Sequence, residues 1–180
     1  MAKKEFTVDI PEKVKILGIS AGHREKMNTY YLVLLALKAA EKLGKKVANI
    51  CDLETEIVDL ADKHIEPCRN CEWRHLPGRG LPYKGTERPK SIGCPITDDY
   101  MAKELMPKMK EADGFIFGSP TYTWSYTSKF RLFSERFSPI LWEGHLTGKP
   151  AAGVTVGEMP FGGQETCLSH INTIIHASEM

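Results

Sequence analysis

The chain has 180 residues, of which 42% are hydrophobic and 26% charged, and its formal net charge is +1. These totals fit one folded domain with a substantial core, and they lack the basic excess of a surface that binds nucleic acid or anionic membrane. The longest apolar run, residues 30–37, is too short to span a bilayer, and the charged amino terminus has no apolar signal segment. We therefore expect a cytoplasmic protein that binds neither nucleic acid nor membrane.

The first predicted strand, Val14–Ile19, is a continuous apolar run, which is typical of a strand buried in a parallel sheet. A polar loop follows, and residues 28–44 then repeat apolar side chains at helical spacing. A helix that begins after such a loop can bind a phosphate through its backbone N–H groups and its dipole. Arg24, Asn28 and Thr29 would add side-chain donors. Alternatively, Arg24 is only solvated, and Asn28 or Thr29 only caps the helix.

The second strand can be placed in two ways. Residues 46–51 can form a strand, but Val47, Ile50 and Leu53 also follow helical spacing, and the strand is then Glu56–Leu60. We prefer the second interpretation, because Glu56–Leu60 leads directly into a segment that contains cysteines.

Three cysteines mark this next segment. Cys68 and Cys71 have the CxxC spacing that can hold one metal centre, and Cys94 follows after a long loop rich in Gly, Pro and basic residues. A cubane iron–sulfur cluster normally needs four cysteines, whereas His75 could complete a tetrahedral zinc site with these three. Reduced thiols without a metal, or a redox disulfide between Cys68 and Cys71, also fit the pattern. The residues themselves leave an iron–sulfur cluster, zinc and no metal as alternatives.

A helix is predicted over Asp99–Glu111, after the cysteines. Thr97 or Asp98 can cap its first turn, and Pro107 is expected to kink it, because proline lacks the N–H group that an inner helical turn needs.

Residues 112–136 combine a buried strand, a polar aromatic loop and an amphipathic helix. Gly114–Gly118 is the strand, and Phe130 and Phe133 return at helical spacing after the loop. The loop therefore lies at the carboxyl end of a parallel strand, where open α/β sheets bind ligands. Its rings and small polar groups suit a flat, hydrogen-bonding, partly apolar ligand such as a flavin, although an ordinary connection that binds nothing has the same pattern. The candidate residues of this loop are Ser119, Pro120, Thr121, Tyr122, Thr123 and Trp124.

Lys149–Val156 is the fourth predicted strand, and a helix begins at Gln164. Between them, Gly162 and Gly163 permit close backbone approach and positive φ, although a flexible linker would have the same composition. The order of elements predicts an α/β fold, a flavodoxin-like doubly wound parallel sheet with strand order 2-1-3-4(-5). The fifth strand is absent from this sequence. We expect either that the chain is truncated or that a partner covers the edge of the fourth strand.

Several of these motifs resemble the NADPH-dependent FMN reductase family, and within it the iron–sulfur flavoproteins of archaea and anaerobes. The resemblance covers most of Val14–Met180. It implies a single flavodoxin-like, flavin-binding domain over residues 1–180, with a cysteine-containing loop inserted at about residues 67–95. The motifs that carry it are Ala112–Gly114, Gly118–Tyr122, Glu135-Arg136, Pro67–Cys71, Cys94–Asp99 and Gly162–Glu165.

The resemblance also implies where FMN binds. The first loop would hold the phosphate, Ser119–Trp124 would line the isoalloxazine ring and the ribityl chain, and Gly157–Gly163 would close over the ring. Gly22-His23-Arg24 stands where the family usually has Ser-Pro-Arg, and Ser20 is available to supply the missing hydroxyl. The implied cofactor-binding residues are Ser20, Gly22, Arg24, Asn28, Thr29, Ser119, Pro120, Thr121, Tyr122, Thr123, Trp124, Gly157, Phe161, Gly162 and Gly163.

The resemblance implies an FMN-dependent oxidoreductase that receives electrons from a nicotinamide nucleotide or a ferredoxin-like donor. The cofactor supplies the chemistry, so no catalytic side chain is assigned. Cys68, Cys71 and Cys94 would hold an iron–sulfur cluster, although Arg74 stands where the family has a further cysteine. The family tends to form dimers and tetramers. The alternatives are a non-enzymatic electron carrier between ferredoxin-like partners and a zinc-stabilised binding module without a flavin.

Overall fold

The computed structural model describes residues 11–46, 51–70 and 94–180. Its centre is a sheet with strand order β2-β1-β3-β4, in which every neighbouring pair is parallel. This is the predicted flavodoxin-like order, and the described residues after β4 form only a loop and a helix. The strands are β1 (Lys13–Ser20), β2 (Asp52–Asp59), β3 (Gly114–Pro120) and β4 (Ala151–Val156).

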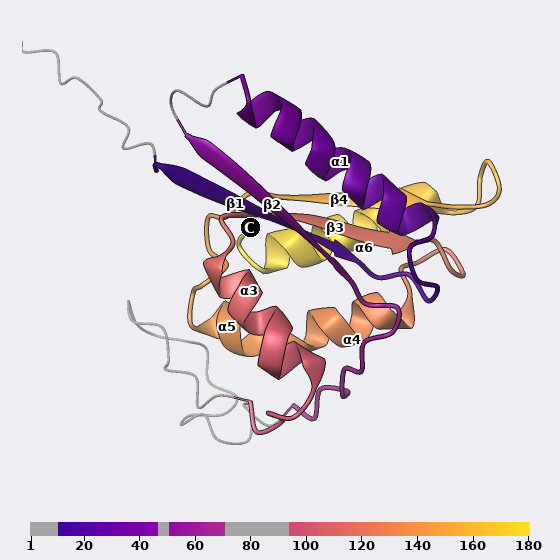
Figure 1. Cartoon of the computed structure of the whole chain (residues 1–180). Coiled ribbons are helices and arrows are strands. Elements are labelled where there is room, and N and C mark those ends of the chain that lie inside the picture. Colours follow the sequence, from indigo (N-terminus) through magenta and orange to yellow (C-terminus); the bar gives the residue numbers. More distant parts are fainter. Residues whose placement is uncertain (1–10, 47–50, 71–93) are drawn as a thin grey trace, which may run out of the picture.

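Helices cover both faces of the sheet, as a doubly wound fold requires (Figure 1). One face carries α1 (Asn28–Gly44), whose buried side chains include Val33 and Leu37. The opposite face carries α3 (Met106–Glu111), α4 (Ser128–Arg136) and α5 (Ser138–Trp142). The last helix, α6 (Gln164–Ala177), packs on β4.

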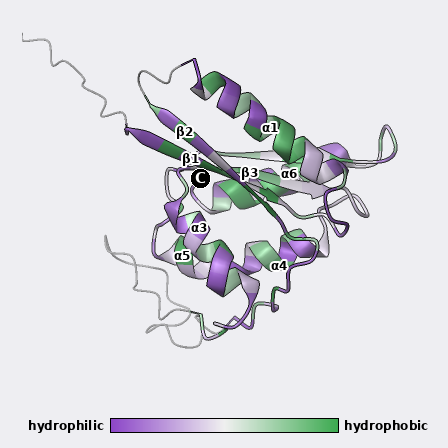
Figure 2. Cartoon of the chain, in the orientation of Figure 1, coloured by the Kyte–Doolittle hydropathy of each residue, from purple (hydrophilic) through white to green (hydrophobic). Residues whose placement is uncertain are grey.

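The core lies between the sheet and the second layer of helices. Phe117 of β3 contacts Phe130 and Phe133 of α4, with ring centroids 6.3 and 5.7 Å apart. All three side chains are at most 1% exposed, so α4 is fixed on β3 by one edge-on and one tilted aromatic contact. On the other face, hydrophilic and hydrophobic residues alternate along α1, as its amphipathic sequence predicts (Figure 2).

The preferred boundary of the second strand is wrong, because β2 begins at Asp52 rather than at Glu56. Leu53 belongs to the strand, opposite Val14 of β1, and the pairing runs without interruption to Ser20 opposite Asp59. The backbone hydrogen bonds of this ladder outweigh the helical spacing of the apolar residues. Residues 47–50, which carry part of the helix in the preferred interpretation and part of the strand in the other, lie outside the described residues.

The predicted helix Asp99–Glu111 is present but wound differently. It starts as a π-helical turn, η1 (Met101–Leu105), and continues as α3, with Pro107 in the first turn. The winding changes from π to α just before Pro107, which has no N–H to donate to the preceding turn. The predicted caps are also wrong: the side chain of Asp99, rather than that of Thr97 or Asp98, accepts from Ala102 N at 3.0 Å.

Candidate flavin groove and cysteine segment

An open groove of about 750 Å³ lies where β1, β3 and β4 end. Three loops meet there, as expected for the edge of a parallel sheet at which the chain reverses its strand order. The volume falls within the usual range of sites for small-molecule cofactors. The groove is lined by Gly22, His23, Arg24, Met27, Asn28, Thr29, Tyr30, Pro120, Thr121, Tyr122, Thr123, Val156, Gly157 and Glu158.

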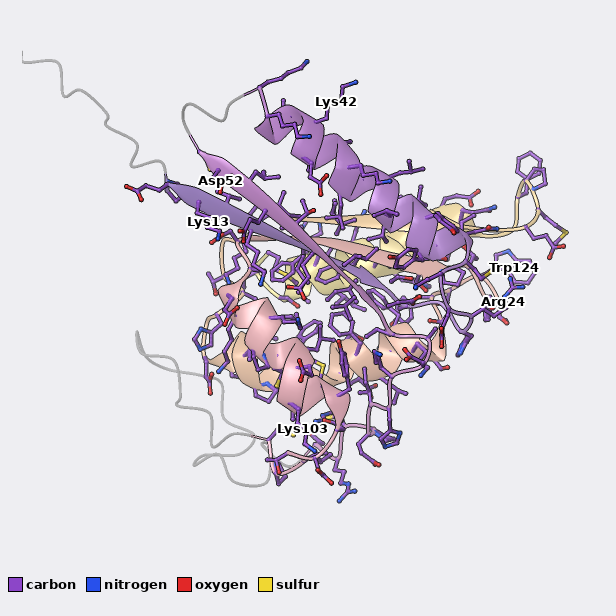
Figure 3. All side chains as sticks on the ribbon, viewed as in Figure 1. Lys13, Arg24, Lys42, Asp52, Lys103 and Trp124 are labelled. Atoms are coloured by element: carbon purple, nitrogen blue, oxygen red, sulfur yellow. The ribbon has the colours of Figure 1, made fainter. Side chains whose placement is uncertain are left out.

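The structure brings most of the predicted flavin residues together at this groove. Those that line it are Gly22, Arg24, Asn28, Thr29, Pro120, Thr121, Tyr122, Thr123 and Gly157. Those that do not are Ser20, Ser119, Trp124, Phe161, Gly162 and Gly163. Figure 3 shows Arg24 and Trp124 at the same end of the molecule, beyond the ends of the strands.

The loop after β1 supplies the polar end of the groove. No side chain of the described residues caps α1, whose cap position is Met27, so the predicted capping by Asn28 or Thr29 is wrong. The first-turn N–H groups are therefore left for an anion. Arg24 is exposed and forms no ion pair with any described residue. This end of the groove has the donors that a phosphate needs.

His23 was missed by the sequence analysis as a groove residue. Its ring stacks on Tyr122, with centroids 5.5 Å apart and planes 23° apart, and its Nε2 lies 3.3 Å from Ser128 Oγ. His23 thus connects the first loop to the loop after β3 and to the start of α4. The only sequence signal was its place between Gly22 and Arg24.

A tight turn shapes the loop after β3. Tyr122 N donates to Ser125 O at 2.8 Å, and Ser125 N donates to Tyr122 O at 3.1 Å. The two central residues, Thr123 and Trp124, have φ values of 49° and 57°, which side chains other than glycine, asparagine and aspartate seldom adopt. The turn leaves Tyr122 45% and Trp124 59% exposed. Their rings are therefore available to a ligand at the groove and its rim.

Ser119 supports this loop from inside. Its side chain is fully buried, and its Oγ accepts from Thr127 N at 3.0 Å. Thr127 in turn donates from Oγ1 to Ala21 O at 2.6 Å and accepts from Phe130 N, which caps α4. Ser20 is likewise buried. The hydroxyls of Ser119 and Thr127 thus hold the two loops in place, and neither Ser119 nor Ser20 lines the groove.

The third loop approaches the second through a glycine. Gly163 has φ +88°, and a Cβ there would lie 2.3 Å from Cδ1 of Trp124. The close approach and positive φ expected of this loop are thus present at Gly163. Phe161 is 92% exposed and forms no part of the groove wall.

A second, much smaller cavity, of about 30 Å³, lies beside the cysteines. Cys68 and Cys94 are half-buried free thiols, and both line it together with Arg136. Cys71 and His75 lie outside the described residues. Within the part of the chain that the structure describes, no three His, Cys, Asp or Glu side chains gather as a metal site.

Arg136 and Asp99 form a buried ion pair next to this cavity, and the sequence analysis missed it. Both side chains are 1% exposed, with Arg136 Nη1 2.5 Å from Asp99 Oδ2. Burial raises the pKa of the Asp99 carboxyl, but the bonds from Arg136, Ala102 N and Glu66 N outweigh it, so the pKa lies below its ordinary value. In the sequence, Arg136 carries no signal beyond its place in the Glu135-Arg136 motif.

The sheet order, together with a groove at the β1/β3 switch point, defines a flavodoxin-like α/β protein. The NADPH-dependent FMN reductase model matches residues 14–180, and the chain belongs to that family. It is 34% identical over 166 residues to an iron–sulfur flavoprotein of Methanocaldococcus jannaschii, covering 91% of this chain and 74% of the relative. It is 28% identical over 169 residues to the iron–sulfur flavoprotein of Methanosarcina thermophila, covering 93% and 75%.

Solved structures agree on the fold. The apo form of an NADH:FMN oxidoreductase superposes with a TM-score of 0.57 at 20% identity, covering 92% of this chain and 69% of the other. An oxidoreductase from Corynebacterium diphtheriae gives 0.61 at 15% identity, covering 94% and 77%.

The family makes the chain an FMN-binding flavin oxidoreductase with an NAD(P)H-type electron donor. It does not favour the alternatives of a non-enzymatic carrier or a zinc-stabilised module without a flavin. None of the helices in the described ranges is both long and apolar enough to cross a membrane.

Proposed function

We propose that this flavin oxidoreductase takes electrons from a nicotinamide nucleotide into FMN bound in the groove, and passes them to a metal centre held by Cys68, Cys71 and Cys94. A one-electron carrier of the ferredoxin type would exchange electrons with that centre. The observation that carries the proposal is the position of α4. Its capping residue Thr127 holds the groove loops, and its last residue, Arg136, lines the cavity of Cys68 and Cys94. A nine-residue helix is about 14 Å long, so α4 links the two sites directly.

FMN accepts hydride and releases electrons when bound, and the residues of this chain position it. We place its phosphate at the first turn of α1, with the backbone of Gly22 and the side chains of Arg24, Asn28 and Thr29 as donors. These residues gather at one end of the groove.

The ring then lies toward the loop after β3, between Pro120–Thr123 and Gly157. Tyr122 offers a stacking surface, and Trp124 and Phe161 shield the rim. Ser20, Ser119, Gly162 and Gly163 act indirectly in this arrangement, since they shape the loops without lining the groove.

The chemistry of the donor set supports a metal at the cysteines. Thiolates suit both iron–sulfur clusters and zinc. The relatives from Methanocaldococcus jannaschii and Methanosarcina thermophila are named iron–sulfur flavoproteins, which favours iron. Cys68 and Cys94 line one cavity, so two of the three cysteines already lie at one site. An iron–sulfur cluster would store and relay single electrons there.

The rim of the groove supports a homo-oligomer, which we propose to be a dimer or tetramer of the single domain 1–180. Trp124, Met159 and Phe161 are 59%, 64% and 92% exposed. Large exposed apolar side chains at the edge of a site are typical of surfaces that a second chain covers.

An anaerobic visible spectrum with iron and zinc analysis tests this function. We expect flavin bands that NADH or NADPH bleaches, a broad underlying absorbance, and bound iron. Cys68→Ser should lose iron and keep FMN, whereas Thr121→Ala/Tyr122→Ala should lose FMN and keep iron. If the wild-type protein contains FMN but no metal, the proposed transfer from the flavin to a metal centre is wrong, and the protein is a simple FMN reductase.

A further inference from the structure

We propose that Arg136 and Asp99 form a clamp that fixes the positions of Cys68 and Cys94, and that Arg136 Nε donates a hydrogen bond to the centre these two thiols hold. The inference rests on the proposed function, because it takes the two cysteines as ligands. It assigns Arg136 as a positioning residue, acting from the opposite end of α4 to the flavin groove.

The clamp ties together the chain on both sides of the two cysteines. Arg136 Nη1 donates to Glu66 O at 2.9 Å, and Nη2 donates to Ile96 O at 3.3 Å. Asp99 Oδ2 also accepts from Glu66 N at 2.9 Å. Glu66 precedes Cys68 by two residues, and Ile96 follows Cys94 by two. One buried guanidinium–carboxylate pair therefore sets the separation of the two cysteine backbones.

One hydrogen-bond donor of this clamp, Arg136 Nε, has no acceptor among the described residues. This nitrogen is buried, so bulk solvent does not supply an acceptor either. A buried donor of a charged group is expensive to leave unpaired, so such an atom points to a ligand or a water. The cavity that Arg136 shares with Cys68 and Cys94 has about 30 Å³, room for only one or two water molecules or for part of a bound group.

The charges around this cavity do not oppose an anionic centre on the thiols. Arg136 is buried and paired with Asp99, so this pair adds no net charge. Glu135, which also lines the cavity, accepts from Arg131 Nε at 2.6 Å and is thereby neutralised. A thiolate-bound centre is negatively charged, and hydrogen bonds to its sulfur atoms are among the factors that set its reduction potential. Arg136 Nε is placed to supply such a bond.

Two variants separate the donor from the clamp. Arg136→Lys keeps a positive charge for Asp99 but removes the Nε donor. The double variant Asp99→Leu/Arg136→Met removes the whole pair and fills its space with apolar groups, which proteins often tolerate without unfolding. Lys110→Met is the matched control, since Lys110 pairs with Glu143, neither residue lines this cavity, and the two side chains are 41% and 31% exposed. FMN content reports that each variant is folded.

The measurements are bound iron after anaerobic reconstitution with iron and sulfide, and the midpoint potential of the centre. We expect Arg136→Lys to keep FMN and iron but to shift the potential to a more negative value, because the reduced centre loses a donor. The double variant should keep FMN and bind at least tenfold less iron. Lys110→Met should match the wild type. An unchanged potential in Arg136→Lys would assign Nε to a buried water and overturn its role.

A cadmium titration keeps the clamp testable if the wild type binds no iron. In a Cys71→Ser background, Cys68 and Cys94 should bind Cd²⁺ together, with thiolate absorption at one ion per chain. Adding the double substitution should weaken that binding at least tenfold, even if the electron path through iron is wrong. Equal Cd²⁺ affinity with and without the ion pair would overturn the clamp itself.

Discussion

The two ends of α4 differ in whether the side chains beside them are exposed or buried. At its amino end, Thr127 and Ser128 connect the loops of the groove, while Tyr122 and Trp124 stay about half exposed. At its carboxyl end, Arg136 is buried against its own partner. The groove is thus shaped by buried supports and leaves its lining side chains free to meet a ligand. In the clamp, by contrast, the charged groups of Arg136 and Asp99 are paired with each other. Substitutions in the groove should therefore change binding first, and substitutions in the clamp should change stability first.

The largest effect is expected from breaking the clamp on one side. Asp99→Asn leaves the Arg136 guanidinium buried without its counter-charge, which typically lowers the free energy of unfolding by about 3–5 kcal/mol. Urea denaturation of the wild type and the variant measures it. The double variant Asp99→Leu/Arg136→Met should lose much less unfolding free energy, because it leaves no buried charge unpaired. A loss below about 1 kcal/mol for Asp99→Asn would mean that the pair is already compensated by water.

Acid should reproduce part of this loss in the wild type. Burial raises the pKa of Asp99 in the folded protein, but the hydrogen bond from Arg136 and those from Ala102 N and Glu66 N outweigh it, so the pKa lies below its ordinary value of about 4. The stability that ionised Asp99 contributes is therefore complete above about pH 4. It is lost as the pH falls through the lower folded pKa. The difference in unfolding free energy between the wild type and Asp99→Asn should therefore shrink below about pH 4. Taking this difference cancels the other carboxylates, such as Glu56, whose pKa is also lowered. A difference that is constant down to pH 2 would contradict the assignment.

Gly118→Ala should lower both the stability of the protein and its affinity for FMN. A Cβ at Gly118 would lie 2.4 Å from Val33 Cγ2 and 3.1 Å from Thr29 Cγ2, so α1 must move away from β3. Overpacking of this kind typically costs about 1–3 kcal/mol. Because Thr29 is in the first turn of α1, FMN affinity should fall as well.

The control for Gly118→Ala is the double variant Gly118→Ala/Val33→Ala, which removes the clashing methyl groups. It should be more stable than the sum of the two single changes, as measured in a double-mutant cycle. Simple additivity would show that α1 does not rest on Gly118.

The elements that sequence predicted well are those with strong local signals. Buried apolar runs placed β1, β3 and β4, and α1 and α6 begin at the predicted Asn28 and Gln164. The strand order and the meeting of three loops followed from topology.

What sequence missed depends on partners far along the chain. The start of β2 is set by its pairing with β1, which local spacing does not report. The partner of Asp99, Arg136, lies 37 residues away at the end of α4. The stacking of His23 on Tyr122 likewise needs two loops to meet. An isolated arginine or histidine carries no sign of such a contact, so only the fold reveals it.

The smallest expected effect on stability comes from Tyr122→Ala in the groove. The ring is 45% exposed, so its loss should change the free energy of unfolding by less than about 0.5 kcal/mol. A stacked aromatic contact with the flavin contributes about 0.5–1.5 kcal/mol, so FMN affinity should fall by up to about tenfold. Fluorescence titration of the apoprotein with FMN measures it.

Tyr31→Ala is the matched control, because Tyr31 is 55% exposed on α1 and does not line the groove. It should leave FMN affinity unchanged. If both tyrosines behave alike, the flavin does not lie on the loop after β3. If Tyr122→Ala instead destabilises the apoprotein as much as a clamp variant, the stack on His23 supports the loops, and the groove is not the independent, binding-first region that its exposure indicates.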